Sequence, residues 1–229
     1  MAVVALAFAS VGLLAQEDAY LKWDTKRVSA VVAAAHGDGK VGSRTLLFWT
    51  GWDSRLLKTE RAQNYKLRAT WFTPDVVRAS ARWAQLRSRL SDEETRGLVE
   101  DARRAGDTVV VVDVDPNEGS GVIPTDWEAF LRPKDAPQES GRFVRGTAVD
   151  DLRKLRALQP IAQRNYDYDR FWVVFPLTTD TGAPLFDAAD TQAELLVRIY
   201  NREGAVSWPI PVDVRARPRT EPPPAVPVK

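Results

Sequence analysis

The sequence contains no cysteine and a single histidine, His36, and these two scarcities exclude several kinds of chemistry. Without cysteine there is no disulfide, no thiolate metal site, no cysteine nucleophile and no lipid attached to a thiol. A zinc site built from several imidazoles is also excluded, and a Ser–His–Asp triad would have to use His36. The neighbours of His36 are alanine, glycine and aspartate, which predict a solvated loop residue.

The chain also lacks an excess of charge of either sign. Its 32 basic residues meet 31 acidic ones, which gives a formal net charge of +1. A nearly neutral chain has no overall field that would concentrate it on nucleic acid or on an anionic membrane, so we expect no nucleic-acid partner. Its 229 residues, 44% of them apolar, are enough to enclose one substantial hydrophobic core.

An uncharged apolar run from Ala2 to Leu14 stands at the N-terminus and is followed at once by polar residues. The run is shorter than the roughly 20 residues that a membrane-spanning helix needs, and it has the length of the apolar region of a secretory signal. We therefore expect residues 1–15 to be a signal peptide cleaved after Ala15. The mature protein would then have no transmembrane span and an extracytoplasmic location, periplasmic or secreted. The alternative is a buried strand or core helix.

Several short segments have the patterns of strands. Val109–Val112 is apolar at every position, and Tyr166–Leu177 has apolar residues on both faces, so both segments are expected to be central strands. Tyr65–Phe72 and Ala193–Tyr200 alternate between apolar and polar residues, which predicts half-buried strands. Further short strands are expected at Leu46–Thr50, Trp127–Leu131, Arg142–Thr147 and Val206–Ile210.

Glycine-rich segments predict loops between these strands. Gly37–Gly42 (GDGKVG) is expected to be a loop that follows Val28–Ala35, an apolar segment that fits either a strand or a short helix. Asn201–Gly204 is expected to be a hairpin loop whose final glycine takes a positive φ.

Residues 74–105 predict a pair of helices. Thr73 is a suitable N-cap and is followed by proline, which is well tolerated at the first helical position. Ser91 and Glu94 have the spacing of a capping box, so a second helix should begin there, and Gly106 should end it.

Many short strands with little strict β–α alternation favour an antiparallel arrangement over a doubly wound parallel sheet. We therefore predict a mainly β protein of the α+β class, with an antiparallel immunoglobulin-like β-sandwich at 45–213 and a two-helix insertion at 74–105. Residues 16–44 would be an N-terminal lead-in segment. Residues 214–229 contain too many prolines and too few apolar residues to pack, which predicts a disordered tail.

The segment Val109–Gly121 (VVVVDVDPNEGSG) contains the most suggestive group of polar residues. Asp113, Asp115 and Asn117 stand at the first, third and fifth positions of a calcium-loop pattern, which makes them candidates for metal ligands. The pattern then fails, because its sixth position is not glycine and its twelfth position is not glutamate.

Val109–Asp115 also resembles the first motif of the haloacid-dehalogenase-type phosphatases. The resemblance implies a nucleophilic Asp113, a general acid at Asp115 and a magnesium ion between them. The family places Gly-Thr or Gly-Val after the two aspartates, where this chain has Pro116 and Asn117. The interpretation that accounts for every residue is a buried strand that ends as it reaches solvent, with no catalytic residue, no metal and no cofactor.

Three residues are candidates for ligand binding: Trp52, Asn117 and Asp126. Trp52 follows a glycine and precedes polar residues, and an exposed indole can stack on carbohydrate. Asp126 could act with Asp113 as a carboxylate pair of the kind that hydrolyses glycosides.

The expected function is that of an exported bacterial envelope protein, a non-catalytic binding or structural module with an envelope protein or a glycan as partner. One alternative is a metal-dependent hydrolase or phosphatase that uses Asp113 and Asp115. Another is a protein–protein adaptor that uses the helical pair at 74–105.

Overall fold

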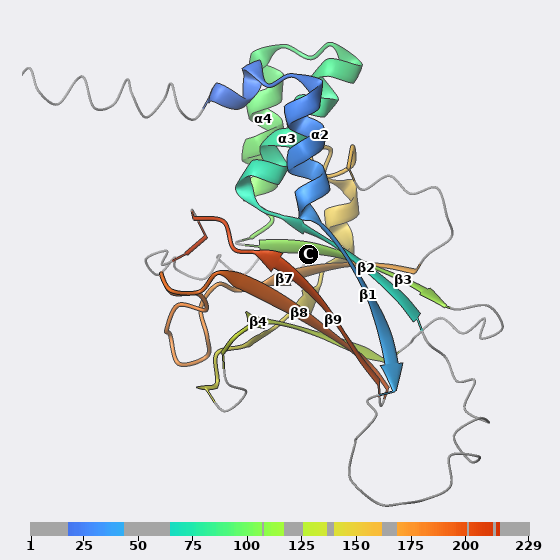
Figure 1. The fold of residues 1–229 in the computed structure, drawn as a ribbon. Coiled ribbons are helices and arrows are strands. Elements are labelled where there is room, and N and C mark those ends of the chain that lie inside the picture. Colours follow the sequence, from blue (N-terminus) through green and yellow to red (C-terminus); the bar gives the residue numbers. More distant parts are fainter. Residues whose placement is uncertain are drawn as a thin grey trace, which may run out of the picture.

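The computed structural model describes residues 18–43, 65–106, 108–116, 126–136, 140–161, 169–200, 202–212 and 214–215. Its strands are antiparallel and its helices gather at one end of the sheet, so the mainly antiparallel α+β class is confirmed (Figure 1). The predictions for residues 1–15, for Leu46–Thr50 and for nearly all of the tail lie outside the described residues. Among the described residues, no helix is long and apolar enough to cross a membrane.

The described strands form a nine-stranded sheet in the order β5-β4-β8-β9-β1-β2-β3-β7-β6. The strands are β1 (His36–Ser43), β2 (Tyr65–Phe72), β3 (Thr108–Pro116), β4 (Trp127–Pro133), β5 (Val144–Arg145), β6 (Thr147–Ala148), β7 (Asp169–Phe175), β8 (Gln192–Ile199) and β9 (Arg202–Pro209). The two end strands, β5 and β6, are separated only by Gly146, whose N–H donates to the carbonyl of Ala129 at 2.9 Å. The sheet therefore curls until its two edges approach each other, and its shape is close to a barrel.

The immunoglobulin-like sandwich is not confirmed. β1 pairs with β2 along His36–Val41 and with β9 at Gly42 and Ser43, so it joins both halves into one sheet. A curled sheet and a sandwich both bury one face of each strand. The alternation of apolar and polar residues therefore cannot distinguish between them.

The inner face of the curled sheet encloses the main hydrophobic core. Trp71 lies at its centre, with its ring 5.8 Å from that of Trp208 and 6.2 Å from that of Phe186. All three rings are buried, and they come from β2, β9 and the connection between β7 and β8. Aromatic residues distant in sequence thus hold the two halves of the sheet together.

The prediction that Val109–Val112 is a central strand is confirmed, because β3 pairs with β2 on one side and β7 on the other. Val110 and Val112 face the main core, whereas Val109 and Val111 face a second core beneath the helices. The strand continues to Pro116, so Asp113 and Asp115 lie within it rather than beyond its end.

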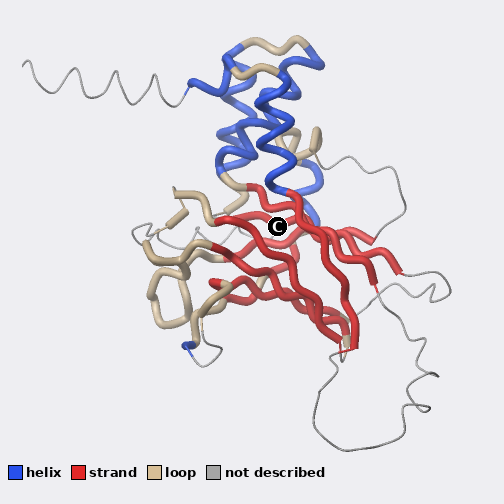
Figure 2. The backbone as a smooth tube through the Cα atoms, viewed as in Figure 1, coloured by secondary structure: helices blue, strands red, loops and turns tan. Residues whose placement is uncertain are grey.

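The helices gather at one end of the sheet (Figure 2). There they pack on its outer face against Phe72 of β2, Val109 of β3 and Trp172 of β7. The α-helices are α2 (Thr25–Ala35), α3 (Pro74–Ser88) and α4 (Asp92–Arg103), accompanied by the short 3-10 helices η1 (Asp18–Lys22) and η4 (Asp150–Lys154). The predicted pair is confirmed as α3 and α4: Thr73 caps α3, and Ser91 and Glu94 form the capping box of α4. The ambiguous segment Val28–Ala35 belongs to α2.

The predicted loop at Gly37–Gly42 is wrong, because these residues lie in β1. The glycines are needed for close packing against β9. A Cβ atom on Gly37 would lie 2.1 Å from Cγ1 of Val206, and one on Gly39 would lie 2.4 Å from the carbonyl oxygen of Ala205. Both distances are too short for real atoms, so any larger residue would push β1 and β9 apart.

The predicted position of the β8–β9 turn is also wrong. Ile199 pairs with Arg202, so the strands extend to these two residues and Arg202–Gly204 is not part of the turn. Tyr200 takes the positive φ, at 52°, whereas Gly204 lies within β9. A Cβ atom on Gly204 would be 2.6 Å from the carbonyl oxygen of Lys40, so this glycine also allows close packing of strands.

Candidate functional site

A groove of about 240 Å³ lies on the outer face of β4 and β8. These two strands lie away from the helices (Figure 1). Its walls combine aromatic, aliphatic and arginine side chains. The lining residues are Phe130, Arg132, Ala136, Ser140, Arg142, Phe143, Leu196, Arg198 and Glu203.

The alternation of β4 and β8 explains why apolar groups face outward here. Ala129 and Leu131 are buried in the main core, so Phe130 and Arg132 point to the opposite face. The strand register places Leu196 directly opposite Phe130. The outer face of β4 and β8 therefore carries an apolar pair that none of the described helices covers.

An aromatic pair forms the apolar centre of the groove. The rings of Phe130 and Phe143 meet edge to face, with their centroids 6.1 Å apart. Phe143 is 48% exposed, which is high for a phenylalanine. The guanidinium of Arg198 lies over the Phe130 ring at 5.5 Å from its centroid. Exposed aromatic rings beside arginine are the residue types that contribute most to binding at protein interfaces.

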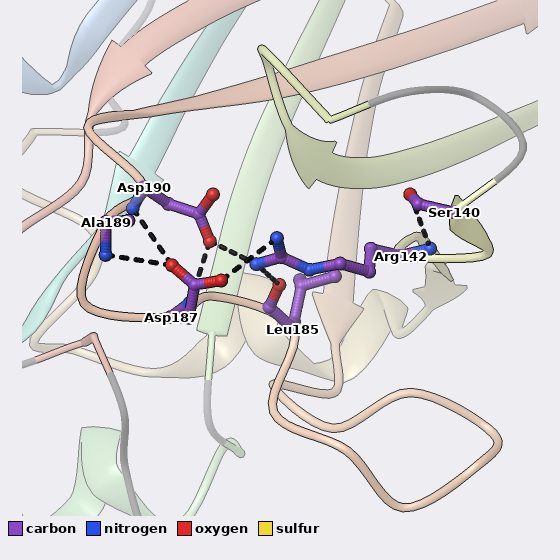
Figure 3. A network of polar contacts seen from close by, with 6 residues as sticks. All are labelled: Ser140, Arg142, Leu185, Asp187, Ala189 and Asp190. Carbon is purple, nitrogen blue, oxygen red and sulfur yellow. Dashed lines mark hydrogen bonds and ion pairs between the residues drawn. The ribbon is translucent and has the colours of Figure 1, made fainter.

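Arg142 is held by a network that joins the groove to the β7–β8 connection (Figure 3). Its guanidinium donates to the carbonyl of Leu185 at 3.1 Å and forms ion pairs with Asp187, at 3.1 Å, and with Asp190. These contacts fix the direction of a long side chain that would otherwise lose conformational entropy on binding a partner.

The two aspartates of this network are themselves held by backbone hydrogen bonds. The Asp187 carboxylate accepts from the N–H groups of Ala189 at 2.8 Å and Asp190 at 3.2 Å, and the Asp190 carboxylate accepts from the N–H of Asp187 at 2.7 Å. The Ala189 hydrogen bond and the Arg142 guanidinium lower the pKa of Asp187. The carboxylate is therefore ionised at neutral pH and keeps its ion pair with Arg142.

The other two arginines of the groove differ in how tightly they are held. Arg132 lies opposite Glu194 and donates to it twice, at 2.6 and 2.9 Å. Arg198 is 47% exposed, and its ion pairs with Glu203 and Glu128 are longer, at 3.4 and 3.5 Å. Arg198 is thus the arginine that can turn most easily towards a bound group.

Asp113, the strongest candidate of the aspartate segment, is engaged in an ion pair. It is only 5% exposed, and the Arg170 guanidinium binds it twice, at 2.6 and 2.8 Å. The register places Arg68 of β2 on the other side of Asp113. Arg68, Asp113 and Arg170 therefore lie side by side on β2, β3 and β7, and their charges alternate across the outer face of the sheet.

The other residues proposed from the sequence are placed only in part. Asp115 is half-buried and lies opposite Lys66, on the same face as Asp113. Asp126 is exposed just before β4. Trp52 and Asn117 lie outside the described residues. Within the described ranges, no three His, Asp or Glu side chains are grouped so that they could hold a metal ion. The metal, catalytic and ligand roles of these residues stay predictions.

His36 is the first residue of β1 rather than a loop residue. Its Nδ1 lies 2.8 Å from the hydroxyl of Thr70 on the neighbouring strand. Partial burial against the sheet and the nearby Arg68 guanidinium lower the pKa of His36, so the imidazole is neutral at pH 7. A neutral ring bonded to a threonine hydroxyl is well explained as part of the sheet surface.

The groove residues were not predicted as a site from the sequence. One signal was available, because Phe130 occupies the polar side of β4 in the segment WEAFLRP. Phe143 and Arg142 come from a different segment, and no local pattern joins them to Phe130.

The fold and the groove define an α+β protein with one curled antiparallel sheet, a layer of helices on part of its outer face and an open aromatic–arginine groove on another part. Comparisons of the chain with family models, curated proteins and solved structures find no significant match. The functional argument therefore depends on the chemistry of the groove itself.

Proposed function

We propose that this protein is a non-catalytic binding module whose groove on β4 and β8 holds an acidic peptide segment of a partner protein. The observation that carries the proposal is the exposed Phe143 ring, packed against Phe130 and surrounded by arginines. An apolar side chain of the peptide would pack on these rings, because covering exposed aromatic surface is favourable.

The charge of the groove favours an acidic partner. Three arginines and a single glutamate line it, so the charged donors that a bound peptide meets are guanidinium groups. Each of these arginines has a carboxylate partner, but a guanidinium has five N–H donors and can still donate to a peptide carboxylate. Arg198 has the loosest ion pairs of the three, and it can donate to a peptide carboxylate without first breaking a tight contact. Arg132 and Arg142 are already oriented by Glu194, Asp187 and Asp190, so little further ordering is needed on binding.

The test uses a short fluorescein-labelled peptide of aspartate and glutamate with a central phenylalanine, titrated with the full chain and followed by fluorescence anisotropy. We expect binding that weakens by about tenfold or more in Phe143→Ala, because the ring is the exposed anchor. Arg198→Gln should also weaken binding and make it less sensitive to salt. A peptide with lysine in place of the acidic residues should not bind.

Leu86→Ala is the matched control, because Leu86 is a similarly exposed apolar residue at 44%, on α3 rather than in the groove. It should leave binding unchanged. The alternative adaptor that uses the helical pair predicts the reverse pattern, with a loss in Leu86→Ala and none in Phe143→Ala. That pattern, or no binding of the acidic peptide to the unaltered chain, would reject the groove as the binding site.

We further propose that the protein acts outside the cytoplasm, in a bacterial envelope, after removal of residues 1–15. The support is the short apolar run that precedes the polar residues at Gln16 and beyond. The test is mass spectrometry of the protein recovered after expression in a bacterium. An exported chain that begins at Gln16 is expected, and a chain that keeps Met1–Ala15 in the cytoplasm would contradict the proposal.

A further inference from the structure

A second cavity, of about 450 Å³, opens between the helices and the sheet. It lies where β2 ends and β3 begins, and the register there places Phe72 opposite Val109. It shares no lining residue with the groove on β4 and β8. The two features can therefore be altered separately.

The walls of this cavity are mostly apolar and come from two helices, two strands and the segment after η4. Val77 belongs to α3, Val99 and Ala102 to α4, and Leu158 to the segment that follows η4, while Phe72 and Val109 form the floor on the sheet. All except Val77 are buried. Apolar pockets of a few hundred cubic ångströms with a few polar groups are typical of small-molecule sites.

The polar side chains of the cavity are both cationic. Arg78 projects from α3 and Arg103 from α4, and no acidic residue lines the cavity. Arg78 pairs with Asp75 at 3.0 Å, and Arg103 pairs with Glu100 at 3.5 Å. A guanidinium has five N–H donors, so each arginine can keep its carboxylate neighbour and still donate to a ligand. Two arginines from neighbouring helices at one apolar opening favour a ligand with an anionic end.

We propose that this cavity binds a small amphipathic carboxylate, with its hydrocarbon part between α3, α4 and the sheet and its carboxylate at Arg78 and Arg103. The apolar walls provide burial for the hydrocarbon. The arginines provide charge-assisted hydrogen bonds, whose geometry suits a carboxylate. The site is independent of the proposed peptide groove.

The experiment is isothermal titration calorimetry of the full chain with decanoate, and with decanol and decyltrimethylammonium as neutral and cationic probes of the same chain length. We expect decanoate to bind about tenfold more tightly than decanol, because only the carboxylate can form charge-assisted hydrogen bonds with the arginines. The cationic probe should not bind. Equal affinity for decanoate and decanol would overturn the assignment of the arginines, and no binding of decanoate would overturn the site.

Three variants locate the binding. The double variant Arg78→Gln, Arg103→Gln should weaken decanoate binding by about tenfold. Arg104→Gln should not, because Arg104, the C-cap residue of α4, does not line the cavity and pairs with Asp101. Ala102→Phe should abolish binding by filling the cavity. The double variant changes only partly exposed side chains, so it decides the question even if the filled cavity does not fold. Decanoate binding that is unchanged in the double variant would overturn the proposal, and Phe143→Ala should leave it unaffected.

Discussion

Asp113 and Arg170 illustrate how much of a residue's role depends on its partner. Their side chains are 7% and 15% exposed, and two short hydrogen bonds join them. A carboxylate in a valine-rich strand suggests a reactive group when it is considered alone. In the folded chain it pairs with a nearly buried guanidinium, and each of its two oxygens accepts a hydrogen bond from that group.

We predict that Asp113→Ala destabilises the protein by about 3 kcal/mol, because it removes two short hydrogen bonds and a charge partner from the nearly buried Arg170 guanidinium. Urea unfolding measures the change. The control is Asp38→Ala, which removes the carboxylate from an exposed pair with Arg68, and there the loss should be at most about 1 kcal/mol. Equal losses in the two variants would show that burial does not determine the strength of these pairs.

The contribution of Asp187 to the stability of the protein depends on pH. Its pKa is lowered in the folded protein, by the Ala189 N–H and then by Arg142, so its carboxylate stabilises the fold above the pKa of the unfolded chain. That contribution disappears as the pH falls through the lower, folded pKa. Asp187→Asn should therefore be less stable than the unaltered protein at pH 7, and the difference should shrink below about pH 4. Thermal unfolding across this pH range measures it, and a difference that stays constant would contradict the assignment.

At the level of elements, the same amino acid has opposite effects in β1 and in α4. Gly39 lies where β1 crosses close to the carbonyl of Ala205, whereas Gly97 lies in an exposed position of α4 with open space around its Cα. Glycine is required at the first position by packing. At Gly97 the glycine only lowers the stability of α4, because glycine loses more backbone entropy on folding than alanine does.

We therefore predict that Gly97→Ala stabilises the protein by about 1 kcal/mol. Gly39→Ala should destabilise it by about 1–3 kcal/mol, because its Cβ would lie 2.4 Å from a backbone oxygen that cannot easily move. Both changes are measured by urea unfolding under the same conditions. A stabilising effect of Gly39→Ala would show that β1 and β9 do not need this close approach.

At the level of the whole molecule, the two cores share their strands. β2, β3 and β7 bury one face against the inside of the curled sheet and the other against the helices. β1 extends directly from α2 and pairs with strands of both halves. If the helices or the curled sheet lost their packing, apolar side chains of the shared strands would be exposed to water.

We expect this sharing to make unfolding a single cooperative transition. Far-ultraviolet circular dichroism follows the helices, and tryptophan fluorescence includes Trp71 and Trp208 inside the sheet. The two signals should give the same urea midpoint, both in the unaltered protein and in Asp113→Ala. Midpoints that separate would indicate that the helices and the sheet unfold as independent units.

Several elements were determined by the sequence alone, because their causes lie within a few neighbouring residues. The N-caps at Thr73 and Ser91 predicted both helices of the pair, and the alternation of Tyr65–Phe72 predicted β2. The uninterrupted valines of β3 predicted a strand buried on both sides. Each of these patterns depends on local geometry that the rest of the chain did not change.

Only the tertiary structure decided how those elements meet. The carboxylate of Asp113 pairs with Arg170, 57 residues away, and the groove combines Phe130 with Phe143 and Leu196 from separate strands and connections. Likewise, Gly39 is a strand residue because β9 passes beside it. A periodicity of two or of 3.6 residues specifies which face of an element is buried, but not which distant element covers it, because that choice depends on the simultaneous packing of the whole chain.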